Sequence, residues 1–163
     1  MKPLQISSWK KFEVMNNELQ NETIRSWLLE DGPITERIKL KNKFNLKLLK
    51  DEVSNIDSSD EDFLGNISGC VKVREVILMA DNVPKVFARS LIPEITIEHG
   101  LSKLGSLGST PLGDILFEKK IFKKIEVLFS KFIVNKEIFW GRKTKYLVKN
   151  LPFSVMEIFL IDK

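Results

Sequence analysis

The sequence predicts an α+β fold, in which a single antiparallel sheet of about six strands has helices covering one face. Strand-like segments follow one another directly, with short turns between them, and this order indicates antiparallel pairing. Helix-like segments are confined to the N-terminal region and to residues 94–118, a segregation that is typical of α+β proteins. Because 163 residues suit one domain, we expect a single domain over residues 1–163.

Two short helices are expected near the N-terminus. Residues 22–30 place apolar side chains at the i, i+3 and i+4 positions of a helix face. Asn21 is suited to cap the start of this helix, and Gly32 and Pro33 follow it as a stop signal. A second helix is expected over residues 34–40.

Apolar runs and alternating patterns predict strands in much of the remaining chain. Two of these segments flank the turn-like sequence Asp81-Asn82-Val83-Pro84, which is typical of a hairpin. Residues 57–66 are polar and acidic, and we interpret them as a solvated loop. The predicted strands are residues 44–48, 71–80, 85–93, 121–134, 138–148 and 153–161.

The residue inventory excludes several kinds of site. Cys70 is the only cysteine and His99 the only histidine. An internal disulfide is therefore impossible, and a zinc site built from Cys and His is excluded. The acidic residues at 57–62 lack the spacing of an EF-hand loop, so we expect no metal.

The charge balance is compatible with a small anionic ligand drawn to a local positive site. The net charge is +4, but the Lys and Arg residues are spread among the acids without a basic block, so we do not expect nucleic-acid binding. No apolar run approaches the ~20 residues of a membrane helix, and no secretory signal is visible. We expect a cytoplasmic monomer.

Charged residues interrupt two strands that are otherwise apolar on both faces. Arg74 and Glu157 lie inside such strands, where an unpaired charge costs several kcal/mol. They indicate either a buried structural Arg–Glu pair, or a Glu on a wet face, or a dry pocket in which Arg74 holds a substrate carboxylate and Glu157 a hydroxyl. Arg89 on the neighbouring strand is either a solvent-facing or cross-strand arginine, or a second anion contact.

A glycine-dense loop lies at residues 104–117. Gly108 and Gly113 have the spacing of a phosphate loop, but Asp114 stands where that motif needs Lys, so a nucleotide site of that kind is rejected. The loop opens a short helix near Leu112. Its free backbone N–H groups could receive an anion, or the segment is merely a turn.

Five segments in order resemble the chorismate lyase family, and the resemblance spans nearly the whole chain. They are WLLEDGPITERI (27–38), VREVILMADNVPKVFARSLIP (73–93), LGSTPLGDILF (107–117), FWGRKTKYL (139–147) and VMEIFL (155–160). The resemblance implies that chorismate loses its enolpyruvyl group as pyruvate while the ring aromatises to 4-hydroxybenzoate, at the start of ubiquinone biosynthesis. It also implies that no metal or organic cofactor is used, and that the ligand is enclosed between an antiparallel sheet and helical flaps.

The resemblance further implies the site residues. Arg74 would bind the ring carboxylate, and the backbone amide of Leu112 would contribute to the same pocket. Glu157 would hydrogen-bond the 4-oxygen of the ring, so Arg74 and Glu157 are the expected catalytic residues. Ile34 would be the flap residue, where the family usually carries Met or Leu. Arg89 is a candidate for the enolpyruvyl carboxylate.

An alternative comes from another functional class. The same fold resembles the effector-binding domain of bacterial transcription regulators, which binds small ligands without catalysis. Those regulators normally carry a winged-helix domain at the N-terminus. Only about 70 residues precede the first strong hairpin here, which leaves no room for that domain, so we expect the enzyme.

Overall fold

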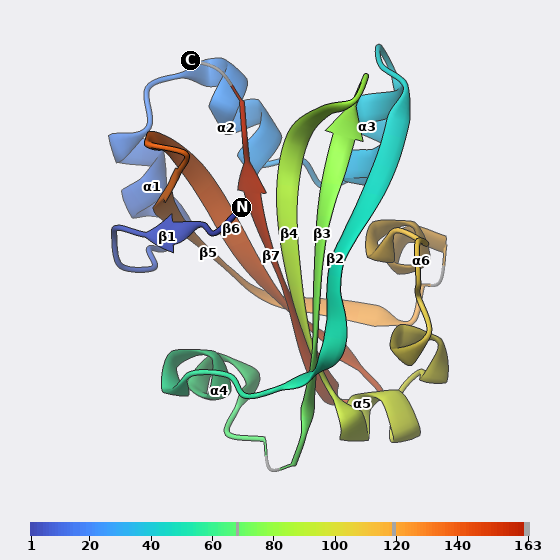
Figure 1. The fold of residues 1–163 in the computed structure, drawn as a ribbon. Coiled ribbons are helices and arrows are strands. Elements are labelled where there is room, and N and C mark those ends of the chain that lie inside the picture. The colour runs from blue at the N-terminus through green and yellow to red at the C-terminus, as the bar shows by residue number, and fades with distance from the viewer. Residues whose placement is uncertain (68, 119, 162–163) are drawn as a thin grey trace.

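A seven-stranded antiparallel sheet forms the centre of the computed structural model, which describes residues 1–67, 69–118 and 120–161 (Figure 1). The strand order is β1-β5-β6-β7-β4-β3-β2, so the predicted α+β architecture is confirmed. Each predicted strand is present, and the additional strand, β1, is too short to show a sequence pattern. The strands are β1 (Leu4–Gln5), β2 (Phe44–Ser54), β3 (Val71–Ala80), β4 (Val83–Pro93), β5 (Phe122–Val134), β6 (Glu137–Val148) and β7 (Leu151–Phe159).

Tight turns fix the hairpins β3–β4, β5–β6 and β6–β7. Each turn has two central residues with positive φ, the conformation whose twist matches that of the flanking strands. Asn occurs in every pair and tolerates this conformation better than most residues. The pairs are Asp81–Asn82, Asn135–Lys136 and Lys149–Asn150.

The helices are short. They are α1 (Phe12–Glu18), α2 (Glu22–Leu28), α3 (Ile34–Lys39), α4 (Ser58–Leu64), α5 (Glu94–His99) and α6 (Leu112–Glu118), with a 3-10 turn η1 (Ser102–Gly105). The expected cap is confirmed, because Asn21 Oδ1 accepts a hydrogen bond from the Ile24 N–H at 3.0 Å. Both predicted N-terminal helices and the helix near Leu112 are confirmed as well.

The strand register assigns side chains to the two faces of the sheet. One row of direct cross-strand partners consists of Val76, Ala88, Glu157, Arg142 and Phe129 on β3, β4, β7, β6 and β5. These side chains share one face, which we call the first face. Their immediate chain neighbours point to the second face.

Helices cover the first face in two groups. Side chains of α1, α2 and α3 form a buried cluster with Val76, Leu78 and Phe159. Residues of η1 and α6 form another with Phe153 and Val155. In Figure 1 the two groups lie at different ends of the strands, so the strands run beneath both.

The prediction of a solvated loop over residues 57–66 is wrong, because this segment forms α4. Asp57 Oδ1 accepts a hydrogen bond from the Asp60 N–H at 2.8 Å, and Gly65 ends the helix with a φ of 94°. Leu64 is its one buried side chain and packs with Val73, next to Arg74 on β3. This helix therefore lies on the second face, apart from the others.

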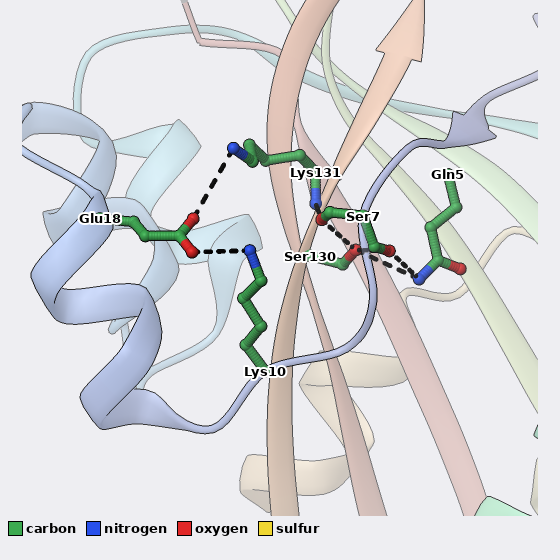
Figure 2. A network of polar contacts seen from close by, with 6 residues as sticks. All are labelled: Gln5, Ser7, Lys10, Glu18, Ser130 and Lys131. Carbon is green, nitrogen blue, oxygen red and sulfur yellow. Dashed lines mark hydrogen bonds and ion pairs between the residues drawn. The ribbon is translucent and has the colours of Figure 1, made fainter.

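The N-terminal segment is fastened to β5, as Figure 2 shows. The Ser7 and Ser130 hydroxyls lie 2.9 Å apart, and the Lys131 N–H donates to Ser7 Oγ at 2.9 Å. Lys10 Nζ donates to Glu18 Oε1 at 2.7 Å, and Lys131 Nζ lies 3.7 Å from Glu18 Oε2. These contacts tie α1 and the preceding residues to the edge of the sheet.

Candidate functional site

A narrow cavity lies on the first face, beneath the connection between α2 and α3. This connection, residues 30–34, is called the flap below, and it forms one wall of the cavity. The start of α6 forms a second wall, and β5, β6 and β7 supply the floor with Lys124, Arg142, Tyr146 and Glu157. About 50 Å³ of space is free between these walls. The cavity is closed in this conformation, since small-molecule pockets usually measure ~300–1,000 Å³.

Arg142 joins the floor of the cavity to the flap. Its Nε donates to Glu157 Oε1 at 2.9 Å, and its Nη1 donates to the carbonyl oxygens of Leu28 and Glu30, both at 2.8 Å. The Arg142 and Glu157 side chains are only 11% and 15% exposed. One planar guanidinium therefore fixes the Glu157 carboxylate and the end of α2 together.

Three interpretations were offered for Glu157, and the structure bears on two of them. It belongs to a largely buried Arg–Glu pair, with Arg142 as the partner, and it also lines the cavity. Arg142 was not predicted, because it stands beside Lys143 and Lys145 in a basic stretch that looks like a solvated strand. The segment FWGRKTKYL could have indicated Arg142, because its glycine, Gly141, stands next to that arginine. Gly141 lets β6 approach β7 closely, since a Cβ at this position would lie 2.9 Å from Glu157 O.

Arg74 is a buried cation whose donors are only partly used. The residue is 2% exposed. Its Nη2 donates to the carbonyl oxygens of Gly108 and Thr110, at 3.0 and 2.9 Å. Within the described residues its Nε has no hydrogen-bond partner. Burial lowers the pKa of the Arg74 guanidinium, although the nearby Asp51 carboxylate opposes this effect. An anion bound at Nε would satisfy the remaining donor.

The register brings Arg74 to the same face as Glu157. Arg74 pairs with Ser90, and Ser90 pairs with Val155, two residues before Glu157 on β7. Val155 lines the cavity. The first-face side chains of β4 next to Arg74, Ser90 and Ala88, are small and buried.

The loop before α6 completes this side of the site. Its carbonyl groups at Gly108 and Thr110 hold Arg74, and it leads directly into Leu112 at the start of α6. Leu112 is buried and lines the cavity, as does Ile34 from the flap. The structure therefore gathers Ile34, Leu112 and Glu157 around one cavity, with Arg74 fastened to the loop beside it.

Arg89 is not part of this cavity. It neighbours Ser90 on β4, so its side chain points to the second face. There its Nη1 lies 3.3 Å from Asp60 Oδ2 of α4, and its Nε lies 3.9 Å from Glu75 Oε2. Of its two interpretations, the structure places Arg89 in cross-strand and helix contacts and away from Arg74 and Glu157.

Two further side chains of the cavity were not predicted. Tyr146 stacks on Phe153 with ring centroids 5.3 Å apart. Burial, together with the Glu157 carboxylate, raises the pKa of the Tyr146 phenol to about 12, so this hydroxyl remains a hydrogen-bond donor. Lys124 lies at the mouth, and its Nζ is 3.7 Å from Asp31 Oδ1 of the flap.

Comparisons with known proteins identify the family of the chain. A sequence model described as chorismate lyase matches residues 4–163. The chain belongs to the chorismate lyase family. A probable chorismate pyruvate-lyase of Pseudomonas putida is 33% identical, over 93% of this chain and 88% of the relative. A chorismate pyruvate-lyase of Hamiltonella defensa is 30% identical, over 93% and 84%.

Solved structures with a similar fold come from transcription regulators. One of the GntR family from Bacillus cereus gives a TM-score of 0.53 at 12% identity, over 72% of this chain and 91% of that one. A possible regulator, YydK from Bacillus subtilis, also gives 0.53, at 10% identity, over 96% and 86%. At such identities the likeness shows that the chorismate lyase fold of this chain is shared with these regulators.

The described parts of the chain carry neither a cluster of metal ligands nor a helix that could span a membrane. In residues 1–67, 69–118 and 120–161, His, Cys, Asp and Glu side chains do not gather in a group of three or more that could hold a metal ion. The helices of the same residues are all too short or too polar to cross a membrane.

Proposed function

We propose that this member of the chorismate lyase family converts chorismate to 4-hydroxybenzoate and pyruvate, as the first committed step of ubiquinone biosynthesis. The observation that carries the proposal is the buried Arg74, whose Nε has no hydrogen-bond partner among the described residues and which lies on the same face of the sheet as the cavity lined by Leu112 and Glu157. A buried, unpaired guanidinium is costly. A carboxylate ligand would reduce that cost, so the site favours a small carboxylic acid.

The reaction is an elimination that breaks the bond between ring carbon C3 and the ether oxygen of the enolpyruvyl group, while the C4 hydroxyl stays on the ring. The ring loses the C4 hydrogen and becomes aromatic, and the enolpyruvyl group takes up a proton and leaves as pyruvate. Aromatisation supplies the driving force. The protein's task is to hold the substrate in a reactive conformation and to exclude water.

Each residue then has a distinct role. Arg74 binds the ring carboxylate, assisted by the backbone amide of Leu112. Glu157 faces the oxygen on C4. Its Oε1 is occupied by Arg142, so Oε2 is the oxygen that accepts a hydrogen bond from the hydroxyl of the product. Ile34 closes the cavity from above, where its apolar side chain replaces the Met or Leu usual in the family.

Ligand entry requires the flap to move. The closed cavity holds about 50 Å³, well below the ~300 Å³ at the lower end of ligand pockets. The flap is attached to the floor chiefly through Arg142 and through the ion pair of Lys124 with Asp31. Flap opening, and therefore product release, is expected to limit turnover.

The same proposal includes a monomer acting in the cytoplasm on small molecules. It is supported by the even spread of Lys and Arg among 22 acidic residues, which offers no block for nucleic acid. Size-exclusion chromatography with light scattering tests the monomer directly, and a mass near 18.8 kDa is the expected result.

The activity is tested by mixing the purified protein with chorismate in the presence of a chelator. We expect equal amounts of 4-hydroxybenzoate and pyruvate, measured by chromatography. Arg74→Met should weaken 4-hydroxybenzoate binding by at least tenfold, because a charge-assisted contact is worth ~1.5–3 kcal/mol. Glu157→Gln should keep most of the binding and lower turnover.

A different outcome would redirect the proposal. A protein that binds 4-hydroxybenzoate tightly but leaves chorismate unchanged would be a ligand-binding module, as the fold of the transcription regulators would permit. Near-normal 4-hydroxybenzoate affinity in Arg74→Met would refute the placement of the carboxylate. Unchanged turnover in Glu157→Gln would refute the role of its carboxylate.

A further inference from the structure

The end of α2 is held by a side chain from the sheet. The last carbonyl groups of a helix have no partner inside the helix, so they need donors from elsewhere. Arg142 on β6 supplies one: its Nη1 donates to the carbonyl oxygens of Leu28, at the end of α2, and of Glu30, at the start of the flap, both at 2.8 Å. These partners stand 114 and 112 positions from Arg142 in the sequence. The position of the flap therefore depends on a long-range contact with the sheet.

The same guanidinium also fixes Glu157. Its Nε donates to Glu157 Oε1 at 2.9 Å, and the two residues are direct cross-strand partners on β6 and β7. A guanidinium is planar and its donors point in fixed directions, so Nε and Nη1 cannot be aimed independently. Only a narrow range of Arg142 orientations satisfies the carboxylate and both carbonyl groups together. The direction of the Glu157 carboxylate is thus set in part by the flap.

Closure of the flap makes this linkage strong. The Arg142 and Glu157 side chains are 11% and 15% exposed, and Arg142 Cζ lies 5.3 Å from the centroid of the Phe159 ring. In such surroundings few water molecules compete for the hydrogen bonds. Opening of the flap, which a ligand needs in order to enter, would take the two carbonyl groups away from Nη1 and admit water. Arg142 and Glu157 would then be free to turn.

We propose that Arg142 is a positioning residue that couples closure of the flap to alignment of the Glu157 carboxylate, an inference that rests on the proposed lyase function. With the flap closed, Oε1 is held by Arg142 and Oε2 faces the C4 oxygen of chorismate. With the flap open, neither oxygen has a fixed direction. Chorismate bound to Arg74 in the open form therefore does not react until the flap has closed and excluded water.

Arg142→Lys tests this coupling. Lysine keeps the positive charge beside Glu157, but its single nitrogen cannot span the carboxylate and both flap carbonyl groups as the guanidinium fork does. The rate of a single turnover, measured with protein in excess over chorismate, is independent of product release. This rate should fall about tenfold or more, because the carboxylate loses its alignment. Dissociation of 4-hydroxybenzoate, followed by stopped-flow absorbance, should become faster, because the flap loses its donor.

Arg37→Lys is the matched control. Arg37 on α3 also holds α2, since its Nη1 donates to the carbonyl oxygen of Ser26 at 2.8 Å and its Cζ lies 4.1 Å from the centroid of the Trp27 ring. It lies outside the cavity wall. The same exchange of a guanidinium for an ammonium group should therefore leave the single-turnover rate within about twofold of the unmodified protein.

A double-variant comparison separates positioning from a merely structural role. If Arg142 acts through the Glu157 carboxylate, its replacement matters little once that carboxylate is gone. Glu157→Gln and Arg142→Lys/Glu157→Gln should therefore have single-turnover rates within about twofold of each other. A structural role would slow the reaction by the same factor in both backgrounds.

A further variant covers the case in which Arg142→Lys folds poorly. Arg142→Met/Glu157→Gln removes both charges of the pair, so neither is left buried without a partner. Its single-turnover rate should also lie within about twofold of that of Glu157→Gln. A much slower rate in this folded double variant would overturn the coupling.

Other results would overturn the inference as well. An unchanged single-turnover rate in Arg142→Lys would show that Arg142 holds the flap without aligning Glu157. An equal loss in Arg37→Lys would show that any loosening of the helices slows the reaction. In each of these cases the unmodified protein still produces 4-hydroxybenzoate, so the lyase function stands. Absence of turnover by the unmodified protein would refute the lyase function, and this inference with it.

Discussion

Replacing Arg142 with methionine should reveal how strongly the floor of the cavity depends on one guanidinium. The change keeps a long side chain but removes the charge and every donor. It leaves the Glu157 carboxylate without its 2.9 Å partner, and it leaves the carbonyl oxygens of Leu28 and Glu30 without their shared donor. Both consequences fall in a part of the protein with little access to water.

The structure gives the magnitude. Removing one member of a buried ion pair costs ~3–5 kcal/mol, because the other charge remains buried and uncompensated. With the Arg142 and Glu157 side chains 11% and 15% exposed, water can reach part of the pair, so we expect the lower end of that range, about 3 kcal/mol. For a domain of this size such a loss lowers Tm by roughly 6–12 °C.

Urea unfolding followed by tryptophan fluorescence measures this loss, since the chain has three tryptophans. Arg142→Met should lower the midpoint with an unchanged m-value. The double variant Arg142→Met/Glu157→Gln should recover part of the loss, because it removes both charges. Lys10→Met is the control: it breaks a hydrogen bond of 2.7 Å to Glu18 at the exposed edge of the sheet, and its midpoint should not differ measurably from the parent.

One result would refute this reasoning. If Arg142→Met lost less than about 1 kcal/mol, the pair would behave as a solvated surface pair. The guanidinium would then not be what holds the flap to the sheet. A Lys10→Met loss equal to that of Arg142→Met would contradict the dependence on burial just as directly.

Three further predictions concern single positions. Gly141→Ala should destabilise the protein by ~1–3 kcal/mol, because its Cβ would lie 2.9 Å from Glu157 O. Gly113→Ala in α6 is the control: its Cβ would meet nothing within 4 Å, so the thermal midpoint should rise slightly. A lower thermal midpoint in both variants would contradict the packing at Gly141. Tyr146 is the only tyrosine, so tyrosinate absorbance of the folded protein should titrate near pH 12; a midpoint near 10 would refute its burial. Between pH 10 and 12 the folded phenol keeps a proton that the unfolded chain has lost, so stability should fall as pH rises, and Tyr146→Phe should remove that loss. Asp57→Ala should cost about 1 kcal/mol by uncapping α4, measured by urea unfolding; no change would rule out the cap.

The regular part of the fold could be predicted because its causes are local. Apolar spacing and a capping Asn21 define α2, and the turn at Asp81–Asn82 defines a hairpin, all within a few residues of sequence. The failure at α4 has a local cause too. Its cap at Asp57 and its stop at Gly65 were present, but one buried residue, Leu64, gave no helical periodicity to detect.

The site was only partly predictable because its geometry is not local. Arg74 and Glu157 stood out as charges in apolar strands. Arg142 did not, because its role depends on Glu157, its direct cross-strand partner on β7, and the sequence does not show that pairing. Arg89 was a poorer candidate because successive side chains of a strand alternate between faces: Ser90 lies on the first face, so Arg89 lies on the second. The pairing of Lys124 with Asp31 joins residues 93 positions apart, and no pattern in the sequence indicates it.

The place of β7 in the sheet has a consequence for how the molecule folds. The strands β2, β3 and β4 can pair as consecutive hairpins, and β5 can pair with β6, but the two sets meet only through β7. Until β7 inserts between them, the outer edge of β4 in the first set and the outer edge of β6 in the second set have no strand partner. Because β7 also carries Glu157, the strand that joins the two sets is the strand that brings this carboxylate to Arg142 on β6. We therefore expect that a chain in which β7 has not paired with β4 and β6 lacks the candidate site.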